Sequence, residues 1–190
     1  NGNQADNSML GAGAVYVFIR NGTVWTQQAY VKSPVMKPCT SGLFSRCPMF
    51  GSAVGLVDNT LAVASNAPVD THIFVNDGTT WSFQESYTTD SISETGILLS
   101  LSRDRFSLGI NSSFTKIVKR TGTTWSEEAQ LVGSISSLAI DGDTVVSGNP
   151  LEDSNATGIN GDPNNTNAPD SGAAYIYSII PSTTCSGLTQ

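Results

Sequence analysis

The sequence predicts an all-β protein built from a repeated unit. Only 13% of its 190 residues are charged, so the Glu and Lys pairs that stabilise helices are scarce, while Ser, Thr, Asn and Gly are abundant, as in strands and turns. The pattern Gly-Thr-x-Trp recurs three times, ending at Trp25, Trp81 and Trp125. The intervals of 56 residues (25 to 81) and 44 residues (81 to 125) indicate a repeat architecture.

Each Gly-Thr-x-Trp turn is expected to connect the two strands of a β-hairpin. The Asn-Gly, Asp-Gly or Thr-Gly pair in each turn supplies the positive φ that a tight connection needs. Apolar and polar residues tend to alternate in the runs that follow, as half-buried strands require. The predicted strand pairs are 14–19 with 25–31, 72–75 with 81–87, and 116–119 with 125–131.

A second kind of hairpin is expected earlier in each unit, and its turns are short and polar. Together the two hairpins give four antiparallel strands in a unit of about 44 to 56 residues, which is the size of a β-propeller blade. The predicted turns are Asp58-Asn59, Arg103-Asp104-Arg105 and Asp141-Gly142-Asp143.

The two ends of the chain also match each other. Asn1-Gly2 and Gly13-Ala14 recur at Asn160-Gly161 and Gly172-Ala173, and both pairs shift by 159 residues, or three times 53. Three repeats therefore separate equivalent points at the two ends.

These motifs resemble a known repeat family. Phe50-Gly51, followed by a hairpin and Asn66-Ala67-Pro68, is similar to the Phe-Gly and Gly-Ala-Pro motifs of FG-GAP repeats, which form the propeller of the integrin α-subunit head, and the run 171–177 resembles the strand that follows them. The resemblance implies blades at 50–90, 96–132 and 133–180, the end of a blade at 1–33 and a tail at 181–190. About three blades would be present.

Thirteen predicted strands leave exposed sheet edges, whereas propellers of this family usually have about seven blades. We therefore expect partners, either further blades of the same polypeptide or other protein subunits. The two most elaborate loops, 39–47 and 153–171, are the candidates for partner contact.

Cysteines and glycosylation motifs favour an extracellular or cell-surface protein. Cys39 and Cys47 bracket a short loop with a proline on either side, so they are expected to form a disulfide in an oxidising compartment. Cys185 is the odd cysteine and could pair outside this chain. The Asn-x-Ser/Thr motif of N-glycosylation occurs at Asn21, Asn111, Asn155 and Asn164.

One loop is a candidate calcium site. Asp162, Asn164, Thr166 and Asp170 fall at positions 1, 3, 5 and 9 of the loop and the Ala168 carbonyl at position 7, an oxygen set that suits calcium. The alternative is a polar, glycosylated loop in which Asp and Asn stabilise turns. The family's own calcium sites lie in turns that are too short here, so those sites are expected to be missing.

The tryptophans and the histidine are interpreted as structural. Trp25, Trp81 and Trp125 are expected to pack each outer hairpin, as Phe50 and Gly51 do at the start of a blade, and sugar stacking is the alternative for the tryptophans. His72, the only histidine, aligns with Tyr16 and Lys116, which predicts a solvated or edge position. A catalytic triad would depend on this one histidine.

Charge and hydropathy limit the partners. Nine Lys and Arg against sixteen Asp and Glu give a net charge of −7, which argues against nucleic acid, and there is no run of about twenty apolar residues for membrane insertion. The basic residues of 103–105 and 116–120 predict either a small positive face or a solubilising edge. The expected function is a non-enzymatic extracellular structural or adhesion module. A lectin-like, calcium-assisted carbohydrate-binding protein is the alternative.

Overall fold

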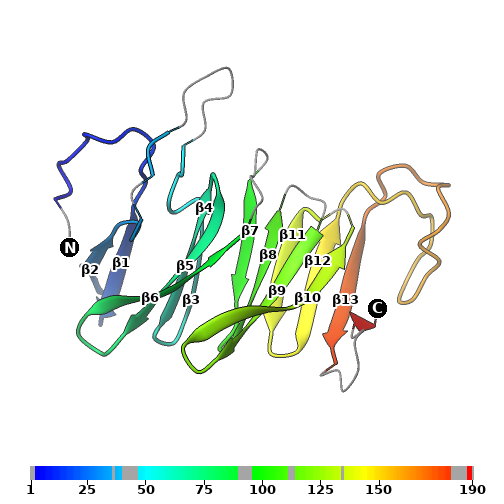
Figure 1. Ribbon diagram of the computed structural model, residues 1–190. Helices are drawn as coiled ribbons and strands as arrows, with labels where there is room; N and C mark the ends of the chain where they lie inside the picture. The colour runs from blue at the N-terminus through cyan, green and yellow to red at the C-terminus, as the bar shows by residue number, and fades with distance from the viewer. Residues whose placement is uncertain are drawn as a thin grey trace.

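The chain folds into four antiparallel β-sheets that lie side by side in a row (Figure 1). The computed structural model describes residues 3–35, 37–39, 47–89, 96–110, 114–133, 135–180 and 188–189. In these residues the regular secondary structure is β-strand, and no helix is long and apolar enough to cross a membrane. The prediction of an all-β protein is confirmed.

Each sheet is an up-and-down meander in which strands adjacent in sequence pair with each other. The first sheet has only β1 (Val15–Asn21) and β2 (Val24–Val31). The second contains β3 (Ala53–Val57), β4 (Thr60–Asn66), β5 (Val69–Asn76) and β6 (Trp81–Thr88). The third contains β7 (Ile97–Leu101), β8 (Arg105–Ile110), β9 (Phe114–Thr121) and β10 (Thr124–Val132). The fourth contains β11 (Ser137–Asp141), β12 (Thr144–Asn149), β13 (Ala173–Ile179) and β14 (Leu188–Thr189).

The predicted hairpins occur where the turn residues placed them, but the fourth sheet differs from the prediction. Residues 181–190 were expected to be a tail, whereas Leu188 pairs with Ile179 and Thr189 with Ser178, which adds a fourth strand. A strand of two residues in a polar stretch has no hydrophobic alternation that could reveal it.

Three hydrophobic clusters fill the spaces between neighbouring sheets. One face of the second sheet packs on β1 and β2, with Val63 and Phe74 facing Val17. Its other face packs on the third sheet through Ile73 and Phe106. A third cluster joins the third and fourth sheets, and along the row β3 lies beside β7 and β7 beside β11. Each sheet is therefore stabilised mainly by its neighbours.

The Phe-Gly pair has a physical explanation in this fold. Phe50 is buried in the cluster between the first and second sheets and forms an isolated bridge with Gly13. Gly51 has a φ of 95°, and a Cβ atom there would lie 2.9 Å from the carbonyl oxygen of Ala14. The chain segments thus cross so closely that only glycine fits without strain.

Candidate functional site

Two of the three tryptophans link neighbouring sheets through the same hydrogen bond. The Trp81 indole Nε1 donates to Oε1 of Gln28 at 3.0 Å, and the Trp125 Nε1 donates to Oε1 of Gln84 at 3.3 Å. Gln28 and Gln84 each follow the tryptophan of their own sheet by three residues. Each tryptophan therefore reaches back to an equivalent glutamine in the preceding sheet. Sequence reasoning missed these glutamines, although the recurring Trp-x-x-Gln was the available signal.

Trp25 does not follow this pattern. It is 64% exposed, whereas Trp125 is 5% exposed and packs against Phe106 at a ring-centroid distance of 5.4 Å. Among the described residues the first sheet has no strand equivalent to β8, which carries Phe106, and no sheet precedes it, so Trp25 lacks the neighbours that cover Trp125. A structural role for Trp25 stays a prediction.

One end of the row exposes an apolar surface that we call the N-terminal end face, formed by Tyr16, Phe18 and Trp25. The residue seven places before each tryptophan is Phe18, Phe74 or Val118. Phe74 and Val118 are buried against a preceding sheet, whereas Phe18 is exposed. The difference in exposure between Phe18 and Phe74 therefore comes from the presence of a preceding sheet and not from the residue type.

The other end of the row exposes the C-terminal end face, formed by Val146 and its cross-strand partner Ile176. Ile73 and Ile117 occupy the equivalent position in the second and third sheets and are 0% exposed, whereas Ile176 is 63% exposed. Each end of the row therefore exposes apolar residues whose equivalents in the middle sheets are buried by a neighbouring sheet.

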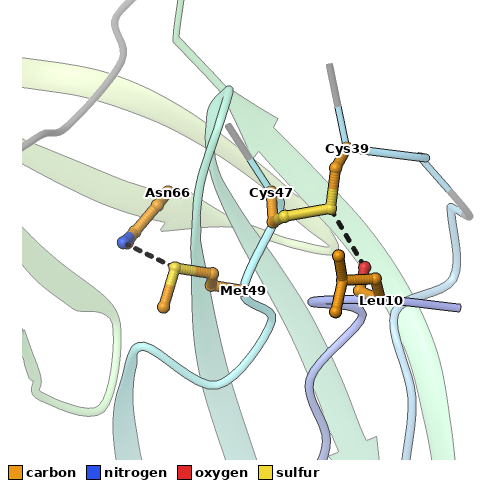
Figure 2. The surroundings of a disulfide bond; sticks show 5 residues. All are labelled: Leu10, Cys39, Cys47, Met49 and Asn66. Carbon is orange, nitrogen blue, oxygen red and sulfur yellow. Dashed lines mark hydrogen bonds between the residues drawn. A yellow bond between two sulfur atoms is a disulfide. The ribbon is translucent and has the colours of Figure 1, made fainter. Parts of the chain in front are cut away.

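The expected disulfide is present between Cys39 and Cys47, with a sulfur–sulfur distance of 2.02 Å. Figure 2 shows Sγ of Cys39 near the carbonyl oxygen of Leu10, at 3.1 Å, and Nδ2 of Asn66 near Sδ of Met49, at 3.8 Å. The bond therefore lies between the N-terminal segment and the strands of the second sheet. Residues 40–46, the interior of the loop, lie outside the described residues.

The long loop before β13 is held together by a buried serine. The Ser154 hydroxyl donates to the Asp162 carbonyl oxygen at 2.6 Å and accepts hydrogen bonds from Nδ2 of Asn165 and the amide of Ala156. The surface of the loop remains exposed, with Ile159 among its most accessible side chains. The loop is thus an ordered, hydrogen-bonded projection.

The predicted calcium ligands lie in this loop, and several of their oxygens have local partners. Oδ1 of Asp162 accepts hydrogen bonds from the amide and Nδ2 of Asn164, at 2.9 and 3.0 Å, and the Ala168 carbonyl accepts one from the Ser171 amide. Thr166 and Asp170 are exposed. In the part of the chain that the structure describes, no three or more Asp, Glu, His or Cys side chains form a group suited to a metal. Calcium binding here stays a prediction.

The predicted glycosylation sites are accessible where the structure describes them. Asn21, Asn155 and Asn164 are exposed, and Asn21 lies at the end of β1 beside the turn. Asn111 lies outside the described residues, as does Cys185.

The prediction for His72 is wrong. Its side chain is buried, its Nδ1 lies 2.7 Å from the Ser86 hydroxyl, and its ring lies 5.6 Å from that of Phe50. Burial lowers the pKa of His72, and the nearby Asp70 carboxylate only partly opposes this effect. The polar residue types aligned at this position predicted exposure. Tyr16 is indeed exposed on the N-terminal end face, but His72 lies in β5, which the first sheet covers.

The basic residues do not form a free positive face. Nε and Nη2 of Arg105 donate to both carboxylate oxygens of Glu128, at 2.6 and 3.1 Å, and its Nη1 lies 3.0 Å from Asp143 in the turn of the next sheet. The Arg105 guanidinium holds the pKa of Glu128 below its usual value. Lys116 and Lys119 pair with Glu127 and Glu128. The Arg105–Asp143 pair joins the third and fourth sheets, whereas the other pairs lie within the third sheet, and the paired charges neutralise one another.

No protein-family model matches the sequence, and the comparison with curated proteins finds no match either. The four sheets can nevertheless be compared with one another, because equivalent positions recur from sheet to sheet. The two end faces and the residues Val54 and Leu56 of β3 are exposed, whereas equivalent positions in other sheets are buried or partly buried.

Proposed function

We propose that this chain is part of a β-propeller similar to the FG-GAP repeats of integrin α-subunits, and that it acts outside the cell as a non-enzymatic structural or adhesion module. In this proposal the four sheets are successive blades, the first of them incomplete. The proposal is supported by the Phe-Gly pair at 50–51, by the recurring Trp turns and by the repeated Trp–Gln bond between neighbouring sheets.

The observation that carries the proposed assembly is the contrast between inner and terminal sheets. Phe18, Trp25 and Ile176 are exposed at positions that are covered elsewhere in the row. Burial of a large apolar side chain contributes about 1.5–3 kcal/mol, and contiguous apolar patches mark interaction sites. Further sheets, from the same polypeptide or from other subunits, would cover both end faces.

Other features support an extracellular site of action. The Cys39–Cys47 disulfide is of the kind that persists in oxidising compartments. Asn21, Asn155 and Asn164 are exposed and available for N-glycans. The ordered loop before β13 and the disulfide loop are the further candidates for partner contact.

Light scattering on the purified chain tests the end-face assembly. We expect concentration-dependent multimers that Phe18→Lys or Ile176→Lys disperses, because a charge in a buried interface is costly. Ile159→Lys is the control, since Ile159 is an apolar residue that is even more exposed than Phe18 and Ile176 but lies in a loop, and it should leave the multimers intact. A chain that stays monomeric at all concentrations, or multimers indifferent to all three changes, would refute the proposed assembly.

A lectin-like function is the alternative, and the exposed Trp25 and Tyr16 favour it because aromatic rings on an open face can stack on sugars. The loop before β13, which contains Asp162 and Asp170, lies at the opposite end of the row from β2, the strand that contains Trp25 (Figure 1). A glycan array, read with and without chelator and with Asp162→Ala and Trp25→Ala, separates the contributions. Binding that needs Trp25 but is indifferent to chelator would place sugar recognition on the N-terminal end face.

A further inference from the structure

A buried carboxylate distinguishes the second sheet from its neighbours. Asp70 is 4% exposed and shares a face of β5 with Phe74, which packs in the cluster between the first and second sheets. The residue eleven places before each tryptophan is Ala14, Asp70 or Phe114. Because the first and third sheets form with an apolar residue at this position, the architecture itself does not require the charge.

Among the described residues the carboxylate of Asp70 pairs with one cation. Its Oδ2 lies 2.8 Å from Nζ of Lys37. In the same part of the chain, Oδ1 of Asp70 and Oγ of Ser65, on the paired strand β4, are buried without a hydrogen-bond partner. A buried charge is costly when its counter-charge is removed. The state of the Asp70 carboxylate therefore depends on Lys37.

The disulfide positions Lys37. This lysine lies in the connection between β2 and β3, two residues before Cys39. The Cys39–Cys47 bond ties this part of the connection to Cys47 (Figure 2), and the next residue, Pro48, is fixed to the second sheet because its carbonyl oxygen accepts a hydrogen bond from the Asn66 amide at 2.7 Å. Both cysteines are half-buried, so a reductant can reach the bond. Opening the bond removes the link between Cys39 and the anchored segment.

His72 lies beside this ion pair and responds to it. Asp70 and His72 are two residues apart on the same face of β5. Burial is the largest influence and lowers the pKa of His72, the Asp70 carboxylate raises it, and the Lys37 ammonium lowers it. Removal of the ammonium therefore leaves the carboxylate free to attract a proton to the imidazole.

The remaining surroundings of His72 carry no charge. On the paired strands its neighbours in register are Val63 of β4 and Ser86 of β6, and the Ser86 hydroxyl lies 2.7 Å from Nδ1 of His72. Its ring lies beside that of Phe50, and the first sheet contributes Val17 and Val31 to the adjoining cluster. The charged groups that act on the imidazole are thus Asp70 and Lys37.

We propose that the Cys39–Cys47 disulfide is a redox switch that sets the charge of a site buried between the first and second sheets. A dithiol reduces the bond: each cysteine sulfur becomes a thiol, and the dithiol gives up two electrons and two protons to become a disulfide. Lys37 then leaves Asp70, and His72 takes a proton from solvent to replace the lost counter-charge. The oxidised chain thus holds a Lys37–Asp70 pair beside a neutral histidine, and the reduced chain holds an imidazolium–carboxylate pair.

The single histidine of the chain makes this switch directly measurable. The imidazole NMR signals of the whole chain report His72 alone, and their pH titration gives the midpoint of its protonation. Reduction with dithiothreitol, verified by alkylation of Cys39 and Cys47 and mass spectrometry, should move this midpoint to higher pH. Equal midpoints in the oxidised and reduced chains would overturn the proposal, and this result does not depend on the proposed end-face assembly.

A lysine variant separates the loss of the ammonium from the opening of the bond. Lys37→Met in the oxidised chain should raise the midpoint as reduction does, and subsequent reduction should add little. Lys32→Met is the matched control, because Lys32 lies in the same connection but its Nζ donates to the carbonyl oxygen of Gly13. This control should leave the midpoint unchanged. A midpoint that does not move in Lys37→Met would contradict the role given to Lys37.

Asp70→Asn distinguishes release of Lys37 from loss of the fold. Without the carboxylate, reduction should leave the midpoint of His72 low, because burial then acts without opposition. If reduction instead unfolds the chain around His72, the midpoint should rise toward the ordinary value of 6.5 in this variant as well. An upward shift on reduction of Asp70→Asn would therefore replace the switch by simple exposure of the histidine.

Discussion

The same Gly-Thr-x-Trp turn lies in two opposite environments in the first and third sheets. Trp125 is 5% exposed, and its ring contacts Phe106 while its indole reaches Gln84 of the preceding sheet. Trp25 is 64% exposed, although the local hairpin is the same. A repeated motif therefore determines a repeated hairpin, whereas burial depends on the further strands and the neighbouring sheet that lie against it.

The largest expected effect is a direct test of this comparison. Trp125→Ala should lower the free energy of unfolding by about 3–5 kcal/mol, because it empties a packed site in the core. Trp25→Ala should change it by less than about 0.5 kcal/mol, as for an exposed residue. Urea denaturation of both variants measures the difference. Equal losses would show that the first sheet is covered in solution.

A second prediction concerns the Cys39–Cys47 disulfide, which lies in the connection between the first and second sheets. Replacing Cys39 and Cys47 together by serine should lower the free energy of unfolding by about 2–3 kcal/mol, because the unfolded chain regains the entropy of the open loop. Urea denaturation with and without reductant measures the effect. Reductant should destabilise the wild type by a similar amount and leave the double variant unchanged, and a response of the double variant would contradict this explanation.

A third, smaller effect sharpens the comparison between the two Trp–Gln bonds. Gln84→Leu should lower the free energy of unfolding by about 1 kcal/mol, because it leaves the buried indole N–H of Trp125 without a hydrogen-bond partner. Gln28→Leu should cost less, since Trp81 is only partly buried and water can replace the amide oxygen. Denaturation monitored by tryptophan fluorescence measures both, and a larger loss for Gln28→Leu would contradict the ranking.

The smallest expected effect is a pH dependence at His72, whose aligned residue Tyr16 is exposed at the end face. Burial lowers the pKa of His72 below 6.5, so the unfolded chain binds the proton more readily than the folded one. Stability should therefore fall as the pH drops below about 6.5. The pKa of Glu128 is held below 4.5 in the folded chain, so the stability that its ionised carboxylate contributes is lost only at more acidic pH.

Thermal unfolding at pH 7.5 and pH 5.5 measures the contribution of His72. His72→Tyr, which introduces the residue of the first sheet, should make the melting temperature less dependent on pH across this window. An unchanged pH dependence in this variant would assign the effect to other groups.

Much of the local structure followed from the residues. The Asn-Gly, Asp-Gly and Thr-Gly turns and the alternation around them predicted the hairpins, and the proline-flanked cysteines predicted the disulfide. The exposure of Trp25, the burial of His72 and the pairing of Arg105 with Asp143 of the next sheet could not be read in this way. Each depends on which sheet lies next to the residue, and sequence patterns contain no direct record of that neighbour.

The sequence by itself therefore determined the strands, their turns and the repeat, because φ preferences and side-chain alternation act over a few residues. Only the tertiary structure decided which faces are covered, because burial requires a second sheet at a distance set by the whole row. The free edge of β1 and the exposed Leu56 arise at that level, where one half of a repeated unit has no counterpart among the described strands.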